Sequence, residues 1–156
     1  MTADSPFTAA ERIASLKAAV IGGISAGFIS FMILILRRVF VFGFEGLSLT
    51  LTSSMATLTL CVNTVIVGFS GALFALVYRY AIRQDKNPQL NAGVVFAFTL
   101  VRGLALVDAG SAIAQNFVPF FLACGESLII FGLTALLLSF LLQRQWLTYF
   151  GQSINP

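Results

Sequence analysis

The chain has 156 residues, of which 58% are hydrophobic and only 10% are charged, and its formal net charge is +3. Soluble domains are about 45–50% apolar and about 25% charged, so a chain this short cannot bury so much apolar surface in one soluble core. No basic run is interleaved with aromatic residues, so we expect no nucleic-acid partner. The composition therefore predicts an integral membrane protein.

Four apolar stretches are long enough to cross a bilayer, which takes about 20 residues in a helix. In chain order they are residues 18–36, 56–78, 92–112 and 117–142. Their length and their content of Ala, Leu and Gly favour helices over barrel strands, which would be about 10 residues long with strict alternation. We therefore predict an all-α fold, an integral membrane bundle of four transmembrane helices over residues 18–142.

The residues on either side of the first stretch predict how it begins and whether it is retained. Residues 1–17 form a leader in which Thr8 precedes Glu11 by three positions, the spacing of a capping box. We expect a helix to start near residue 9 and to run along the membrane interface into the first span. Arg37 and Arg38 stand where a secretion signal has the small residues of its cleavage site, so we expect the helix to be retained.

Two further segments and two cysteines complete the outline. Residues 39–55 are too apolar for an ordinary loop, so they extend the first span, re-enter the membrane or lie flat at the interface. Residues 143–156 form a C-terminal tail. Cys61 and Cys124 lie inside spans and form no disulfide framework, so we expect both to act as small apolar residues.

The Lys and Arg residues beside the spans predict orientation, because cytoplasmic loops carry an excess of these residues. With both termini cytoplasmic, six of them lie on the inner side: Arg12, Lys17, Arg79, Arg83, Lys86 and Arg144. Arg37 and Arg38 then lie on the outer side, and the opposite orientation exchanges the two counts. We therefore predict cytoplasmic termini, or stromal ones if the membrane is a thylakoid.

The third and fourth stretches carry charges at depth. A charge at the bilayer centre costs about 2.5–3.5 kcal/mol, so it normally faces a partner. Asp108 lies six residues beyond Arg102, about 120° round a helix axis, which is a poor fit for a direct pair. Arg102 and Glu126 are each twelve residues from Ala114, the centre of the turn between the spans, so we predict an ion pair at equal depth. Asp108 would lie nearer the outer surface, where Asn63 of the second span can donate to it.

Small residues at four-residue spacing predict close helix packing. The pairs are Gly23 with Gly27, Gly68 with Ala72 and Gly71 with Ala75. The pattern predicts contact with a helix and does not distinguish a helix of this chain from one of a partner. Gly103 and Gly125 flank the predicted ion pair, and we expect them to let the third and fourth helices approach.

The sequence offers little for catalysis. It contains no histidine, which excludes paired-histidine haem ligation, histidine metal sites and the usual histidine base. No GxSxG, P-loop or HExxH motif occurs. An enzyme would have to work with Arg102, Asp108 and Glu126 alone. We therefore predict no enzymatic activity, no catalytic residue and no metal site, and the sequence assigns no cofactor.

The four short-looped spans, with Arg102 on the third and the segment GESLIIFG around Glu126 on the fourth, resemble small four-helix membrane proteins of cyanobacterial and plastid type. The resemblance implies a thylakoid or plasma membrane and an accessory role around larger complexes. An Arg–Glu pair between membrane helices is also similar to that of light-harvesting proteins, in which the glutamate binds the magnesium of chlorophyll. Those proteins carry ExxxxR on one helix, whereas position 131 here is Phe131, so no ligand assignment is carried over.

Three functions are open on these observations. The one we favour is a non-enzymatic accessory subunit or assembly factor of a larger membrane complex, which contacts lipids and other membrane helices. The second is a transporter or channel component that uses the intramembrane group of Arg102, Glu126 and Asp108 as an ion or proton path. The third is a pigment- or lipid-binding protein with Glu126 as a ligand.

Overall fold

Over the residues that the structure describes, the protein forms four helices and no strand. The computed structural model describes residues 8–82, 87–106 and 116–150, with the backbone alone over 44–52. The helices are α1 (Ala9–Thr52), α2 (Ser54–Ile82), α3 (Pro88–Ala105) and α5 (Val118–Gln143). The prediction of an all-α bundle is confirmed, and three of the helices are long and apolar enough to cross a membrane: α1 up to Gly43, α2 and α5.

The third predicted span is only partly described. The helix α3 has 18 residues and is not among the three that meet the length and hydropathy needed for crossing. The last part of the predicted span, residues 107–112, lies outside the described residues, as does Asp108. The start of α3 is stabilised by the residues around it. Pro88 is in the first turn, and the side chain of Asn87 accepts a hydrogen bond from the backbone N–H of Gln89 at 3.0 Å.

The helix α1 is longer at both ends than the predicted first span. It begins at Ala9, where the Thr8 hydroxyl accepts a hydrogen bond from the backbone N–H of Glu11 at 3.3 Å. It continues past the charged pair at 37–38 to a kink at Gly43, whose φ of 68° lies in the left-handed region that favours glycine. The first helix therefore extends beyond the predicted span to Gly43, and a separate helical segment follows the kink as far as Thr52.

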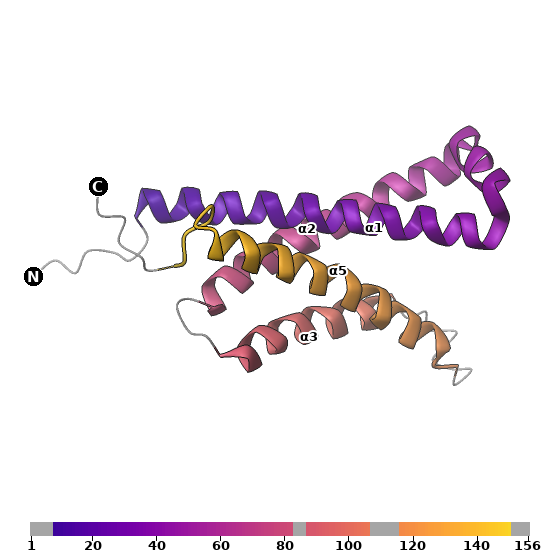
Figure 1. Ribbon diagram of the computed structural model, residues 1–156. Coiled ribbons are helices and arrows are strands. Elements are labelled where there is room, and N and C mark those ends of the chain that lie inside the picture. The colour runs from indigo at the N-terminus through magenta and orange to yellow at the C-terminus, as the bar shows by residue number, and fades with distance from the viewer. Residues whose placement is uncertain (1–7, 83–86, 107–115, 151–156) are drawn as a thin grey trace, which may run out of the picture.

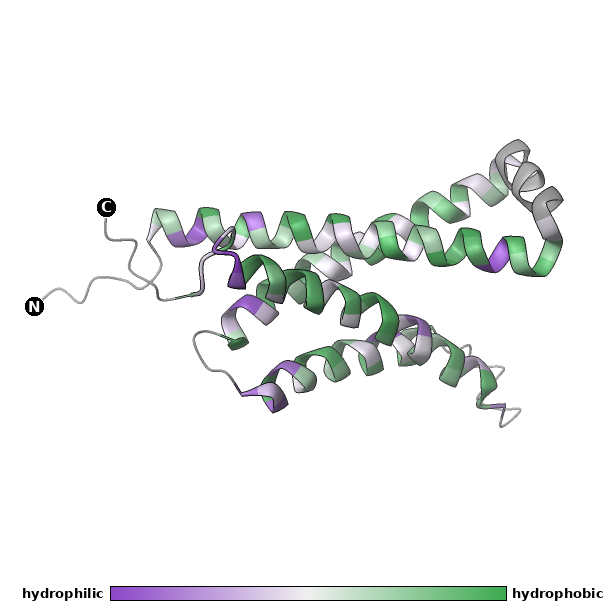
Figure 2. Ribbon diagram, in the orientation of Figure 1, coloured by the Kyte–Doolittle hydropathy of each residue, from purple (hydrophilic) through white to green (hydrophobic). Residues whose placement is uncertain are grey.

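The helices form two antiparallel hairpins, α1 with α2 and α3 with α5 (Figure 1). The start of α1 and the ends of α2 and α5 lie at one end of the molecule, where hydrophilic residues gather (Figure 2). Toward the opposite end α5 runs away from α1, so the two hairpins diverge (Figure 1). Hydrophobic residues run along all four helices, as expected where the solvent is lipid (Figure 2).

An aromatic cluster fills the centre of the bundle between the hairpins. Phe74 of α2, Phe98 of α3 and Phe131 of α5 meet with ring centroids 5.1–5.6 Å apart. Phe74 and Phe131 are fully buried, and both ring contacts to Phe98 are edge-to-face, the arrangement that aromatic quadrupoles favour. The cluster therefore ties three helices together with apolar contacts alone.

Glycines set the separation of α1 and α2. A Cβ atom added to Gly71 would lie 2.7 Å from the carbonyl oxygen of Gly22, and one added to Gly23 would lie 3.0 Å from that of Gly68. A Cβ on Gly27 would reach 3.5 Å from the Thr64 carbonyl oxygen. The small-residue faces of α1 and α2 thus pack on each other within this chain, and Gly22, which the sequence pattern did not single out, is one of the most crowded positions.

In the hairpin of α3 and α5, a glycine of α3 lies at the helix contact, whereas the glycine considered on α5 does not. A Cβ on Gly103 would lie 3.3 Å from the Cα of Cys124, so Gly103 brings α3 against the backbone of α5. Gly125 has no atom within 4 Å of such a Cβ position. The close approach expected from this pair of glycines therefore comes from Gly103, because Gly125 faces away from α3.

We expect Gly71→Ala to destabilise the fold by about 1–3 kcal/mol, because the new methyl group overlaps Gly22 and the helices must move apart. The matched control is Gly132→Ala on α5, where nothing lies within 4 Å of the added Cβ. The control should be neutral or slightly stabilising, since alanine is the better helix former. Unfolding in detergent measures both, and equal stability of the two variants would show that α1 and α2 are not in contact at Gly71.

Candidate functional site

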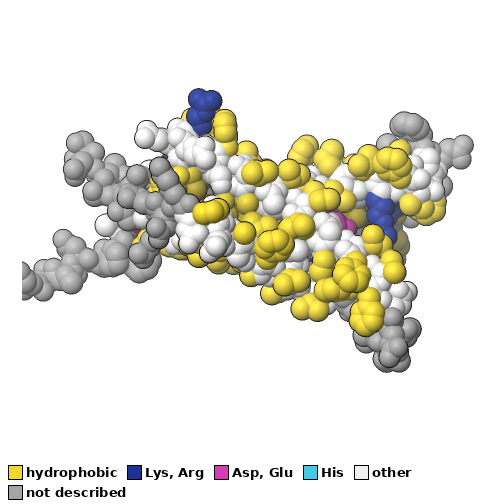
Figure 3. Space-filling model, turned by 60° about the horizontal axis from the view of Figure 1, so that its bottom comes forward, with side chains coloured by type: hydrophobic (Ala, Val, Ile, Leu, Met, Phe, Trp, Pro, Cys, Tyr) yellow, Lys and Arg dark blue, Asp and Glu magenta, His cyan; other side chains and the backbone are white. Residues whose placement is uncertain are grey.

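A polar pocket lies between the two hairpins, in the part where they diverge. It has a volume of about 440 Å³ and receives side chains from all four helices. Its polar lining consists of Arg37 of α1, Asn63 of α2, Arg102 of α3, Glu126 of α5 and Asn116, which precedes α5. On the face drawn in Figure 3, hydrophobic side chains are spread along the described part of the molecule, and charged ones appear in only a few places. The pocket is therefore a concentration of polar groups in an otherwise apolar protein.

Arg102 and Glu126 meet in this pocket as the sequence predicts. The Arg102 Nη2 atom lies 3.5 Å from the Glu126 Oε1 atom, and the two side chains are 10% and 19% exposed. Arg102 on α3 and Glu126 on α5 meet across the hairpin, and Gly103 lets α3 come close enough for the pair to form. At 3.5 Å this is an ion pair without a hydrogen bond of ordinary length.

Ser127 is the nearer partner of Arg102, and sequence reasoning missed it. The Arg102 Nη1 atom donates to the Ser127 Oγ atom at 2.9 Å, and the same hydroxyl donates to the Ala123 carbonyl oxygen at 2.7 Å. Ser127 is fully buried, so its hydroxyl replaces water as a partner for the guanidinium. The sequence offered one indication of this contact. Ser127 is adjacent to Glu126, so both residues of α5 lie within reach of an arginine side chain that extends from α3.

Asn63 has a partner other than the one predicted. Its Nδ2 atom donates to the Oγ atom of Ser30 at 3.3 Å, so it links α2 to α1 while it lines the pocket. The predicted acceptor, Asp108, lies outside the described residues. Ser30 is fully buried, and its hydroxyl gives Asn63 an acceptor within the hairpin of α1 and α2.

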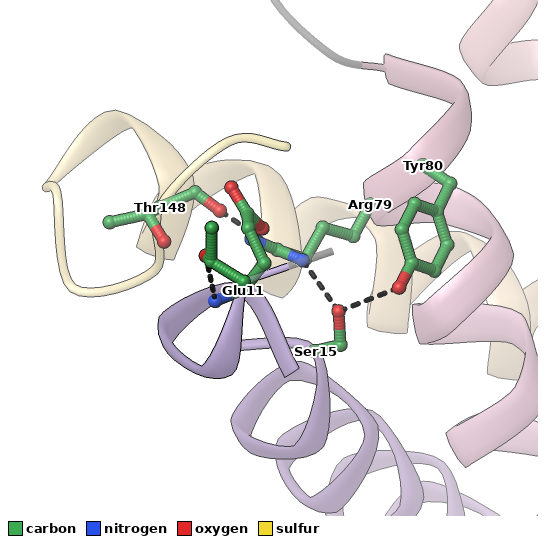
Figure 4. Close-up of polar contacts among 6 residues, drawn as sticks. Glu11, Ser15, Arg79, Tyr80 and Thr148 are labelled. Carbon is green, nitrogen blue, oxygen red and sulfur yellow. Dashed lines mark hydrogen bonds and ion pairs between the residues drawn. The ribbon is translucent and has the colours of Figure 1, made fainter. Parts of the chain in front are cut away.

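A second polar cluster, centred on Arg79, lies at the opposite end of the bundle (Figure 4). The Arg79 side chain is 2% exposed and donates three hydrogen bonds. Its Nε atom donates to the Thr148 carbonyl oxygen at 2.9 Å, and its two Nη atoms donate to Ser15 Oγ at 2.6 Å and to Glu11 Oε2 at 2.5 Å. The Tyr80 hydroxyl lies 2.9 Å from the same Ser15 oxygen.

The Arg79 cluster holds the start of α1, the end of α2 and the segment after α5 together. The sequence indicated Arg79 only as an orientation signal and Glu11 only as part of a helix cap. Nothing in the sequence marks Arg79 as buried, since an Arg at the end of an apolar span usually reaches water. The Nε atom and both Nη atoms of Arg79 have hydrogen-bond acceptors within the protein, so the cluster stabilises the contact between these three segments.

The chemistry of the pocket is that of binding. A guanidinium, a carboxylate and an amide can hold a polar group through charge-assisted hydrogen bonds. Over the described part of the chain, no three His, Cys, Asp or Glu side chains are placed to hold a metal ion. Cys124 is a free cysteine that packs against Gly103 rather than facing a base.

Comparison with protein-family models finds no matching family, and comparison with curated proteins and with solved structures finds no similar protein. The pocket and the arrangement of the helices are therefore the basis for a proposed function.

Proposed function

We propose that the protein is a non-enzymatic accessory subunit of a larger membrane complex, and that it binds a helix of that complex at the pocket between its hairpins. The observation that carries the proposal is the position of the Arg102–Glu126 pair, at the wall of a pocket that opens between the hairpins. Charged groups at membrane depth are costly when they face hydrocarbon, so such a pocket favours a polar group of a partner as its content.

The apolar centre of the bundle favours binding over conduction. Toward the Arg79 end, the space between the hairpins is filled by the rings of Phe74, Phe98 and Phe131. Ile130 and Leu138 are buried beside them, at 0% and 2% exposure. A path for ions or protons requires polar groups or water along its length, and at this level the aromatic and aliphatic side chains interrupt it. The pocket is thus better suited to holding a group than to passing it on.

For location, we infer a bacterial inner membrane, or a thylakoid, with both termini on the cytoplasmic or stromal side. The basis is the excess of Lys and Arg on that side. Attachment of a membrane-impermeant thiol reagent to a cysteine placed at Gln89, in a chain lacking Cys61 and Cys124, reports the side of the loop before α3. Labelling from outside in intact cells would show that the orientation is the opposite of the one inferred here.

Site-specific photo-cross-linking in the native membrane tests the proposal. A photoreactive residue replaces Leu122, which is 65% exposed and lines the pocket. The expected product is one discrete adduct with a different membrane protein, and it should be lost in the double variant Arg102→Leu with Glu126→Leu. The same residue at Phe69, which is 71% exposed and lines no part of the pocket, is the matched control.

The outcomes separate the three candidate functions. Adducts with a second copy of this chain alone would contradict the accessory role. They would indicate a homo-oligomer, the arrangement expected of a transporter. Adducts with lipid alone would remove the partner helix and leave a lipid- or pigment-binding protein. Equal adducts at Leu122 and Phe69 would mean that the pocket has no special part in the contact.

A further inference from the structure

A second hollow, distinct from the polar pocket, runs along the outside of the α3–α5 hairpin. It is an open groove of about 590 Å³ with a largely apolar lining, and it shares no lining residue with the pocket around Arg102. Its walls include Val95, Phe96, Leu128, Ile129, Leu133 and Leu136. Phe96, Ile129 and Leu136 are 54%, 52% and 68% exposed, so the groove opens on the surface that faces lipid.

One end of this groove is polar. Asn91 of α3, Tyr78 of α2 and Ser139 of α5 line it, and none of the described lining residues is charged. Tyr78 is four residues before the end of α2 and Ser139 is four before the end of α5, while Asn91 is in the first turn of α3. All three therefore lie toward the same end of the bundle, where a membrane interface is expected.

Among the described polar groups that line the groove, Asn91 has an atom without a hydrogen-bond partner. The Tyr78 and Ser139 hydroxyl oxygens are 2.7 Å apart and bond to each other. The Asn91 Oδ1 atom is buried and has no hydrogen-bond partner among the residues that the structure describes. Buried amide groups in proteins are nearly always hydrogen-bonded, and an unpaired one calls for a ligand or a neighbour that supplies the bond.

We propose that this groove binds a lipid with an uncharged, hydroxyl-bearing head group, with the head at Asn91 and an acyl chain along the apolar walls. A hydroxyl can donate to the Asn91 Oδ1 atom, which is the atom that lacks a partner, whereas an ether oxygen can only accept. An anionic or cationic head group would gain no ion pair from the lining residues that the structure describes. The inference goes beyond the proposed accessory role and does not depend on a partner helix.

The test uses the full chain in phosphatidylcholine vesicles with a diazirine-tagged monoacylglycerol as the probe. Photolysis should label α5 within residues 128–136. The probe's dimethyl ether, which cannot donate a hydrogen bond, should label about threefold to tenfold less, as the loss of one hydrogen bond implies. The variant Asn91→Leu should lower labelling by the free probe to the same degree, whereas Gln89→Leu, on the same helix and outside the groove, should not change it.

A second pair of variants tests the chain-binding part of the groove. Gly132 lines it, and a Cβ there meets no atom within 4 Å, so Gly132→Leu fills the groove without disturbing the fold. Gly125→Leu, seven residues earlier on α5, also has open space and lies outside the groove. Labelling should fall in Gly132→Leu and persist in Gly125→Leu. Equal labelling by the monoacylglycerol and its ether, or equal labelling of each variant and its control, would overturn the proposal.

Discussion

Arg79→Leu is expected to lower the free energy of unfolding by about 3–5 kcal/mol, the cost of leaving one partner of a buried ion pair alone. The substitution removes three hydrogen bonds at once and leaves the Glu11 carboxylate, which is 12% exposed, without its guanidinium. It also frees the start of α1 and the segment around Thr148 from the end of α2. Denaturant unfolding in detergent measures the loss, and we expect the N-terminal part of α1 to become sensitive to protease.

Two controls separate the cluster from a general effect of charge. Arg12→Leu removes an exposed Arg one position from Glu11 and should change the stability by no more than about 0.5 kcal/mol. Glu11→Gln keeps an oxygen that accepts from Arg79 and should cost less than the loss of Arg79 itself. If Arg79→Leu and Arg12→Leu unfold alike, the buried cluster does not hold the three segments together.

Arg102→Leu and Glu126→Leu are each expected to cost about 3 kcal/mol, because the charge that remains is unpaired in an apolar surrounding. The double variant Arg102→Leu with Glu126→Leu should recover most of that loss, since neither charge is left. The two single losses then sum to about 6 kcal/mol against about 1 kcal/mol for the double variant, so the double-mutant cycle gives a coupling energy of about 5 kcal/mol from unfolding in detergent. A coupling energy indistinguishable from zero would mean that the two side chains do not interact.

Exchanging the two residues gives a further check. Arg102→Glu with Glu126→Arg keeps both charges at the same depth, and the Ser127 hydroxyl can donate to a carboxylate at position 102. Stability should therefore be largely restored. If the pocket binds a partner through this pair, the apolar double variant should be stable and yet lose the cross-link at Leu122, so a stable variant that keeps the cross-link would assign the pair to folding alone.

The bounds of a helix could be predicted from the sequence to within a few residues where polar residues flank the apolar stretch on both sides. Residues 56–78 and 117–142 correspond to α2 (Ser54–Ile82) and α5 (Val118–Gln143) within a few residues. The predicted first span ends several residues too early. Two adjacent charged residues, at 37–38, usually mark the end of an apolar span, but here the helix continues past them to Gly43. From Ala9 to Gly43 it has 35 residues and is about 52 Å long at 1.5 Å per residue, more than the roughly 30 Å of the hydrocarbon core.

The sequence by itself determined the all-α class, three of the four apolar spans and the pairing of Arg102 with Glu126. Each depends on properties that are local along the chain: hydropathy over about 20 residues, and equal distances from a short turn, which set equal depth in an antiparallel hairpin. Only the tertiary structure decided which groups meet between hairpins. Arg79 bonds to residues 64, 68 and 69 positions away, and the pocket collects side chains from all four helices. Such contacts depend on how the helices are rotated and crossed, which follows from packing at positions such as Gly22, Gly71 and Gly103 and not from the period of any one helix.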